Sequence, residues 1–165
     1  ARGVHFAVKK NEIFGLLGAN GAGKTTTMNM ITRYFLPTSG DAEIGGVSCL
    51  SNFSQAATHL GVVTQDNSLW DLISVEDHLK LFARLRGVPE SEITNVVLGV
   101  VNQLELMPHR SKLAGRLSGG MKRKLCVAIA LIGNLPKAPL YLKYRSSSAA
   151  TIICPSFTIH APASC

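Results

Sequence analysis

Eight consecutive residues near the start of the chain have the composition of a phosphate-binding loop. The stretch GANGAGKT, residues 18–25, fits the pattern G-x-x-x-x-G-K-[ST] at every required position. Glycine lets successive backbone N–H groups turn toward one anion, and a helix that starts directly afterwards adds the positive end of its dipole. Lys24 can then reach the β- and γ-phosphates of a nucleotide, and the Thr25 hydroxyl can ligate Mg²⁺. The loop therefore predicts a phosphate site.

A second anion-binding surface is predicted at residues 117–120, LSGG. Ser118 and the amides of two glycines stand where a new helix begins, and helix starts of this composition attract anions. An ordinary helix cap has the same composition, so LSGG is informative only together with the phosphate loop. The basic run at residues 122–124 opposes the helix dipole, and we interpret it as a solvated face.

The elements on either side of the phosphate loop must hold it in place. Residues 4–8 alternate like a strand, and residues 12–17, EIFGLL, form a short apolar run typical of a buried parallel strand. A helix is predicted from the loop through Phe35, with Met28, Ile31 and Phe35 on one face. Strand, glycine loop and helix form the βα unit expected of a nucleotide-binding α/β domain.

Further elements follow from turn residues and from apolar periodicity. They are a hairpin at residues 42–49 around Gly45-Gly46, a buried strand at residues 60–64, a helix that a capping box at residues 74–77 starts and Gly87 ends, a second helix at about residues 90–106 and a third at residues 121–132.

The two motifs together resemble the nucleotide-binding domain of ATP-binding cassette (ABC) proteins. LSGG matches the signature motif of that family and places Ser118 94 positions after Lys24; Gln65, 41 positions after Lys24, matches the Q-loop glutamine. The segments EIFGLLGANGAGKTTTMNMI, SVEDHLKLFARLRGV and LSGGMKRKL are similar to the A subfamily, whose full-length members are lipid exporters or importers. Ala19 departs from the family, in which proline is usual at this position.

The resemblance implies an α/β fold with a P-loop NTPase core of ABC type, a helical subdomain and an incomplete C-terminal side. Residues 1–135 would form a partial nucleotide-binding domain. Within it, residues 66–116 would be the helical subdomain that contacts transmembrane domains, and residues 117–132 the signature motif and its helix. Residues 136–165 are expected to be an aberrant, poorly structured tail, in which LYLKY at residues 140–144 is a candidate strand.

The resemblance also implies the ligands, the partners and the site residues. ATP and Mg²⁺ would bind the loop, with Gln65 acting in catalysis and joining Thr25 as a metal ligand. The signature residues would bind ATP that a second nucleotide-binding domain holds in a head-to-tail dimer. The implied location is the cytoplasmic face of a membrane, beside transmembrane domains of the same transporter, and nucleic acid is not an expected partner. The implied nucleotide contacts are Gly18, Asn20, Gly21, Ala22, Gly23, Lys24, Thr25 and Thr26, and in trans Ser118, Gly119 and Gly120.

The chain has no Asp or Glu after Glu105. In the family, an apolar strand ending in aspartate and glutamate comes next (the Walker B motif), and a switch histidine follows later. The aspartate holds Mg²⁺ through water, and the glutamate polarises the attacking water. Here LPKAPLYLKYRSSS follows Asn134, and neither His109 nor His160 stands where the switch histidine is expected. We therefore expect MgATP binding with negligible hydrolysis, and a shifted frame, a retained intron or a damaged copy behind the change.

Composition sets outer limits. A length of 165 residues suits one domain, and no apolar run approaches the roughly 20 residues that span a bilayer. The chain has no initiating methionine or signal peptide, so we expect an internal piece of a larger protein.

Four separated cysteines without a CxxC pair argue against a zinc site and fit reduced thiols. Residues 106–165 carry nine Lys or Arg and no acid, and a segment that lacks acids is automatically basic.

Other functional classes are compatible with parts of this pattern. A DNA-repair or chromosome-structure ATPase would need a long coiled coil between the two motifs, but residues 25–117 contain no heptad array. The LSGG motif disfavours a kinase or GTPase. A ribosome-associated ABC protein without membrane domains remains an alternative that the basic charge favours. The other alternative is a non-enzymatic fragment that binds nucleotide or competes for a partner.

Overall fold

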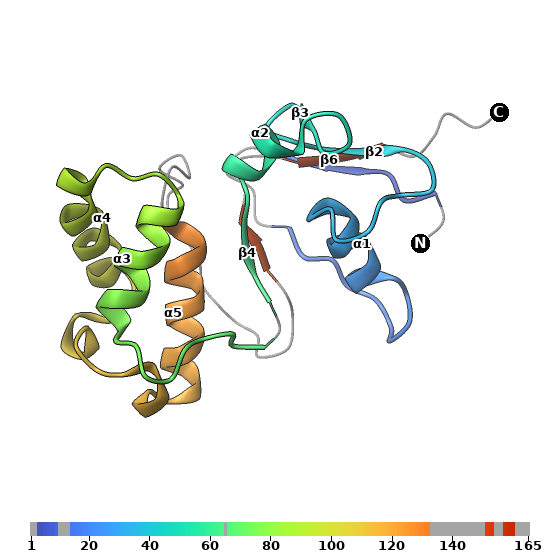
Figure 1. Cartoon of the computed structure of the whole chain (residues 1–165). Helices are drawn as coiled ribbons and strands as arrows, with labels where there is room; N and C mark the ends of the chain where they lie inside the picture. Colours follow the sequence, from blue (N-terminus) through green and yellow to red (C-terminus); the bar gives the residue numbers. More distant parts are fainter. Residues whose placement is uncertain (1–2, 10–13, 65, 133–150, 154–156, 161–165) are drawn as a thin grey trace. The chain divides into compact units, whose positions relative to one another are not determined.

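The computed structural model describes residues 3–9, 14–64, 66–132, 151–153 and 157–160. The chain divides into two compact units, one formed by Ala1–Val62 with Leu135–Cys165 and the other by Val63–Asn134. Figure 1 labels the α-helices and several strands of the two units, each of which is described by itself below. Within the described residues, no helix combines the length and the apolar character needed to cross a membrane.

The first unit contains a four-stranded sheet of order β1-β6-β2-β3, formed by Phe6–Val8, Phe157–His160, Asp41–Ile44 and Val47–Ser48. Each neighbouring pair is antiparallel. The predicted hairpin is confirmed: Gly45 and Gly46 join β2 to β3 with φ of 60° and 79°, which is the two-residue turn that matches strand twist.

The central position of β6 differs from the expectation of a poorly structured tail. Ile159 lies opposite Phe6 on one side and opposite Ala42 on the other. A second tail strand, β5 (Thr151–Ile153), pairs with β4 (Gly61–Val63), which confirms the strand predicted at residues 60–64. The candidate strand at residues 140–144 lies outside the described residues. Short tail segments thus pair with strands more than 80 residues away, which local periodicity could not indicate.

The prediction of a buried parallel strand at residues 12–17 is wrong for the residues that the structure describes. Residues 14–17 belong to no strand, and Phe14 and Leu17 are 48% and 92% exposed. A parallel strand becomes buried only when neighbours pair with it and helices cover it, and no described strand pairs here. Phe14 stacks instead on Phe6, with ring centroids 4.9 Å apart.

Helix α1 (Lys24–Ile31) follows the phosphate loop, as predicted, but ends four residues before Phe35. The chain turns at Arg33, whose φ is 56°, and the N–H groups of Tyr34 and Phe35 both donate to the carbonyl of Asn29. This left-handed residue closes the helix in the manner of a C-terminal cap. Phe35 consequently lies outside the helix, half exposed, and does not share a helix face with Met28 and Ile31 as predicted.

The core of the first unit is small. Its buried residues come from α1, the β2–β3 hairpin, helix α2 (Phe53–Thr58) and the residues around them. Asn52 caps α2 by accepting a hydrogen bond from the Gln55 N–H. The buried set is Ile31, Ala42, Ile44, Cys49, Ala56 and Leu60, with Phe6, Val8, Val47, Phe53 and Ile159 packed against it.

The second unit is helical. Helices α3 (Val75–Leu85), α4 (Glu90–Gln103) and α5 (Gly119–Leu131) pack together, with short 3₁₀ turns η1 (Met107–His109) and η2 (Ala114–Arg116) between α4 and α5. The predicted cap is confirmed, because the Asp77 N–H donates to the Ser74 hydroxyl. All three helices were predicted from sequence, with boundaries within three residues.

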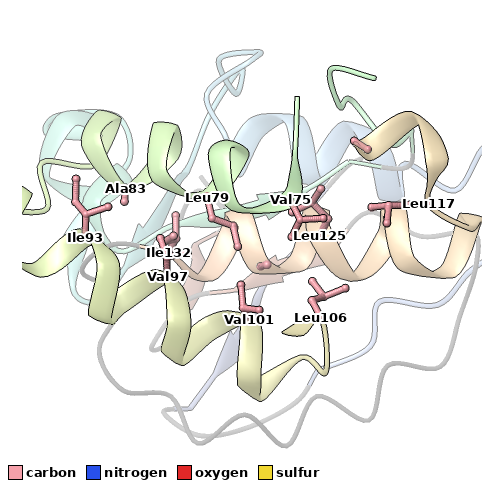
Figure 2. Close-up of a cluster of buried hydrophobic side chains, with 12 residues drawn as sticks. Val75, Leu79, Ala83, Ile93, Val97, Val101, Leu106, Leu117, Leu125 and Ile132 are labelled. Carbon is pink, nitrogen blue, oxygen red and sulfur yellow. The ribbon is translucent and has the colours of Figure 1, made fainter. Parts of the chain in front are cut away.

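One apolar cluster holds these helices together (Figure 2). Leu79 from α3, Val97 from α4 and Leu125 from α5 point into the same interior, and each is buried. Leu117, the first signature residue, belongs to this cluster. Packing of this apolar face therefore holds the start of the signature segment.

Candidate functional site

The phosphate loop (residues 18–25) leads directly into α1. Gly21 and Gly23 have φ of 84° and 92°, a left-handed conformation in which other side chains are strained. The Ala22 N–H closes the turn on the Ala19 carbonyl at 3.2 Å. A Cβ on Gly18 would lie 3.2 Å from the Ala22 Cβ, closer than most contacts of this kind. Backbone conformation therefore favours glycine at positions 21 and 23, and close packing leaves little room for a side chain at position 18.

Lys24 folds back onto the beginning of its own loop. Its Nζ donates to the carbonyl oxygens of Gly18 at 2.7 Å and Ala19 at 2.8 Å. An exposed ammonium group is therefore held against the loop by two backbone acceptors. A phosphate that enters the loop would find a positive charge already within it.

The start of α1 supplies hydrogen-bond donors. Gly23 is the N-cap and offers no side chain, and the first backbone bond of the helix runs from the Thr27 N–H to the Gly23 carbonyl at 2.9 Å. The N–H groups of Lys24, Thr25 and Thr26 precede that bond, so none has a carbonyl partner within the helix. The side chains of Thr25 and Thr26 are exposed, whereas Thr27 is buried and bonds to Gly23. This arrangement fits the binding of a phosphate.

A cavity in the first unit lies alongside α1. It has a volume of about 580 Å³ and is lined by Thr26, Arg33 and Asp41 among others, but by no residue from Gly18 to Thr25. Residues 18–22 of the phosphate loop are exposed and residues 23–24 are partly exposed, so their backbone N–H groups are accessible to an anion.

The signature segment (residues 117–120) forms the start of α5. Ser118 is the N-cap, and its hydroxyl accepts a hydrogen bond from the Met121 N–H at 3.3 Å. Gly119 and Gly120 are exposed, and a Cβ on either would meet nothing within 4 Å. The backbone at these glycines is therefore open to an approaching group. The predicted start of a helix at Ser118 is confirmed, and anion binding at this surface stays a prediction.

The basic run after the signature is only partly the solvated face that was predicted. Lys122 pairs with Asp71 at 3.3 Å, and Lys124 pairs with Glu105 at 2.9 Å. The hydrogen bond from Lys124, aided by its charge, lowers the pKa of the exposed Glu105 carboxyl. Arg123 departs from the prediction because its side chain is buried and its guanidinium donates to the Thr64 carbonyl.

Gln65 lies outside the described residues, but its neighbours do not. The Thr64 hydroxyl donates to the Asp66 carbonyl at 2.7 Å, and Cys126 Sγ lies 3.7 Å from Asn67 Oδ1. Together with Arg123, these contacts hold the residues on both sides of Gln65 against α5. In the second unit, the signature segment starts α5, and residues on both sides of Gln65 contact the same helix. Residues 18–26 belong to the first unit.

Sequence reasoning missed an aromatic stack beside this segment. The Trp70 ring lies 5.6 Å from the His78 ring and 6.0 Å from the Phe82 ring, in stacked geometry. The backbone N–H of Trp70 donates to His78 Nε2 at 3.1 Å, so Nδ1 carries the proton and donates to the Ser74 carbonyl at 2.9 Å. The sequence offered one indication of this stack, a single tryptophan in a polar loop. It could not indicate that His78 and Phe82 are the partners of Trp70, because only the folded chain brings them together.

Part of this stack remains on the surface. Trp70 and Leu72 are 52% and 85% exposed, and a hollow of about 400 Å³ lies between residues 70–73 and Leu81. Exposed apolar groups gathered at a hollow are typical of an interaction surface. We refer to residues 70–73 as the docking loop.

Comparison with known proteins identifies the family. A family model described as "ABC transporter" matches residues 1–138. The retinal-specific phospholipid-transporting ATPase ABCA4 of Bos taurus is 49% identical over 129 residues, 78% of this chain and 6% of that protein. ATP-binding cassette sub-family A member 7 of Mus musculus is 43% identical over 127 residues, 77% of this chain and 6% of that protein.

Solved structures agree with these relatives. An ATP-binding subunit of an ABC transporter superposes with a TM-score of 0.64 at 26% identity and matches 74% of this chain and 51% of that one. For cbiO1 of Clostridium perfringens, part of the ABC transporter complex cbiONQ, the TM-score is 0.68 at 25% identity, over 75% and 51%. The chain therefore belongs to the ABC transporter family, as an α/β ATP-binding domain with relatives in subfamily A.

Proposed function

We propose that this chain binds MgATP through residues 18–26 and is part of the ATP-binding machinery of a membrane transporter. The observation that carries the proposal is the loop itself. It combines left-handed glycines, the exposed start of α1 and a lysine held in place by two carbonyls. Lys24 would neutralise phosphate charge, and Thr25 would ligate Mg²⁺ together with Gln65, which the family resemblance adds.

Replacement of Lys24 tests this proposal directly. The Lys24→Ala variant should bind MgATP about tenfold more weakly or worse, because a charge-assisted hydrogen bond contributes about 1.5–3 kcal/mol. Isothermal titration calorimetry on the purified chain measures the change. Lys112→Ala is the matched control, since it removes an exposed lysine in the other unit. Equal affinity of wild type and Lys24→Ala would contradict the proposal.

We further propose that the chain by itself does not turn over ATP at a transporter's rate. Residues 106–165 contain no carboxylate that could act as a general base, and a positioned base contributes roughly 10²–10⁴-fold. Phosphate release should therefore stay near background in the chain that binds MgATP. Release at a rate typical of transporters that disappears in Lys24→Ala would refute this part of the proposal.

The relatives suggest the transported class and the partners. The name of ABCA4 describes it as phospholipid-transporting. The chain spans only about 6% of the length of these relatives, so a lipid substrate is our inference from similarity. Residues 66–116 would face transmembrane domains on the cytoplasmic side of a membrane, with Trp70 and Leu72 in the contact. The signature segment would meet ATP held by a second nucleotide-binding domain.

The rival proposal of a ribosome-associated protein receives little support from the described residues. The basic count of residues 106–165 favoured it, yet Lys122, Arg123 and Lys124 bond to Asp71, Thr64 and Glu105 within the same unit. These three side chains therefore already have partners within the protein. The alternative of a fragment that binds nucleotide without hydrolysing it is compatible with the proposal above. The two differ in the role of the chain in the cell and not in its chemistry.

A further inference from the structure

The phosphate loop contains an Asn-Gly pair at residues 20–21, and no other asparagine of the chain is followed by glycine. The side-chain amide of an asparagine can be attacked by the backbone nitrogen of the residue that follows it. Glycine in that place removes the Cβ that would crowd the approach and leaves the backbone able to rotate. The sequence thus places the most reactive kind of asparagine inside a phosphate site.

Asn20 and Gly21 occupy the centre of an exposed turn. The Ala22 N–H donates to the Ala19 carbonyl at 3.2 Å, which closes the turn around the pair, and Gly21 has a φ of 84°. A positive φ at the third residue is typical of a type II turn. Both residues are exposed, and a Cβ on Gly21 would meet nothing within 4 Å. Water therefore reaches the pair, and no packed side chain opposes a local rotation of the backbone.

The groups that would react have no partner within the described part of the chain. There, neither the Asn20 side-chain amide nor the Gly21 N–H makes a hydrogen bond to another residue. Asn52 is also exposed, but its side chain accepts from the Gln55 N–H at 3.4 Å and donates to Gln55 Oε1 at 2.8 Å. Such bonds oppose the rotation that an attack requires, so Asn52 has a protection that Asn20 lacks.

We propose that Asn20 is a site of spontaneous deamidation, which lowers the affinity of the phosphate loop for nucleotide. The Gly21 nitrogen loses its proton to hydroxide and attacks Asn20 Cγ. A bond from that nitrogen to Cγ forms, the Cγ–Nδ2 bond breaks, and ammonia leaves with a proton taken from water. Water then opens the cyclic imide at one of its two carbonyl groups and gives aspartate or isoaspartate. Nothing is oxidised or reduced, and water is the only co-reactant.

Either product changes the phosphate loop. Both carry a carboxylate at position 20, directly after the two carbonyls that hold Lys24 Nζ, and a negative charge there repels phosphate. Isoaspartate also adds a methylene group to the backbone of the turn, which displaces the amides that would bind an anion. This consequence rests on the proposed function, since it assumes that the loop binds MgATP.

Bound nucleotide should protect the same site. A phosphate held by the loop would engage its backbone N–H groups and keep the turn in one conformation, so the attack on Asn20 would be slowed. Deamidation would then affect mainly chains that have stayed empty, and its extent would record how long the loop has lacked nucleotide.

Peptide-level mass spectrometry of the full chain, aged for several days at neutral and at mildly alkaline pH, tests the chemistry. Asn20 should convert severalfold faster than Asn52, and faster at the higher pH because the attacking nitrogen must lose its proton. Asn67, which is exposed and precedes Ser68, is a second comparison within the same sample. Conversion of Asn20 no faster than that of Asn52 and Asn67 would overturn the inference.

Calorimetric titration with MgATP tests the consequence. The aged wild type should lose binding in proportion to the converted fraction. Asn20→Gln, compared with its own fresh sample, should lose none, because the longer side chain must close a larger ring and does so much more slowly. Asn20→Asp reproduces one product and should bind MgATP about tenfold more weakly than the wild type. Equal affinity of Asn20→Asp and the wild type would refute the effect on binding.

Ageing with saturating MgATP separates this inference from the proposed function. Slower conversion of Asn20, with the rate at Asn52 unchanged, would support both. If the fresh chain does not bind MgATP, the proposed function is wrong, while fast conversion of Asn20 still establishes the modification site. If MgATP binds and the conversion rate of Asn20 stays the same, the protection is refuted.

Discussion

At the scale of single residues, the site depends on the environment of each group as much as on its chemical type. Lys24 and Lys122 are both exposed or partly exposed lysines, yet one is held by carbonyls in a phosphate loop and the other by a carboxylate. Arg123, between two surface lysines, is buried and holds the Thr64 carbonyl. Residue type indicates which chemistry is available, and neighbours decide whether it is directed at a ligand or at the protein.

Cys126 gives a prediction at this scale. Burial raises the pKa of its thiol, while the charge of Arg123 and a backbone hydrogen bond partly offset the effect. Because the folded state then favours the neutral thiol, iodoacetamide should label Cys126 more slowly than a free thiol, with its pH dependence moved to more alkaline values. Peptide-level mass spectrometry of a labelling time course provides the measurement.

The same shift has a consequence for stability. A raised pKa in the folded state means that the contribution of Cys126 is fully present below the unfolded pKa and is lost as pH rises through the folded one. Cys126→Ala should flatten the alkaline part of the stability curve. Labelling of Cys126 at the rate of an exposed cysteine would show that the thiol is not shielded.

At the scale of elements, one helix can present residues with opposite energetic roles. Leu79 and Leu85 both belong to α3, but Leu79 is fully buried in the cluster of Figure 2 whereas Leu85 is 69% exposed. Leu79→Ala should lower the free energy of unfolding by about 2–5 kcal/mol through lost burial and a cavity. Leu85→Ala should change it by no more than about 0.5 kcal/mol.

Urea denaturation followed by Trp70 emission can measure both variants, because Trp70 stacks on residues of α3. Equal losses in the two variants would mean that the packing of α3 differs from that described. A larger loss of unfolding free energy for Leu85→Ala than for Leu79→Ala would mean that the Leu85 side chain is buried.

At the scale of the whole molecule, the first unit depends on a strand from the far end of the chain. Strand β6 lies between β1 and β2, and Ile159 packs against the core of that unit. Ile159→Asp would place a charge against buried apolar groups, so it should expose the amides of β1 and β2 to hydrogen exchange.

Thr158→Val is the control for this prediction, because neighbouring residues of a strand face opposite sides and valine keeps the β-branched shape. It should leave exchange in β1 and β2 as in the wild type. If Ile159→Asp also leaves both strands protected, β6 is dispensable for the sheet.

Much of the structure could be predicted because it is local. The phosphate loop, the Gly45-Gly46 hairpin and the Ser74 cap each involve contacts within a few residues, where glycine conformation and side-chain capping decide the outcome. The apolar faces of α3, α4 and α5 are also local, since helical periodicity fixes which side chains share a side.

The features that the sequence could not predict depend on contacts between residues far apart in the chain. Residues 12–17 have the composition of a buried strand, but burial requires neighbours that no described strand supplies. Gly115 has no positive φ; the approach of Asp71, 44 positions earlier in the chain, is what leaves little room for a side chain there. The sequence by itself determined the glycine-rich turn at residues 18–25, the helix cap at Ser118 and the helices, because short-range geometry encodes them. Only the tertiary structure decided the sheet order, the burial of Arg123 and the contact of the docking loop with Gly115, because these depend on which distant segments occupy the same space.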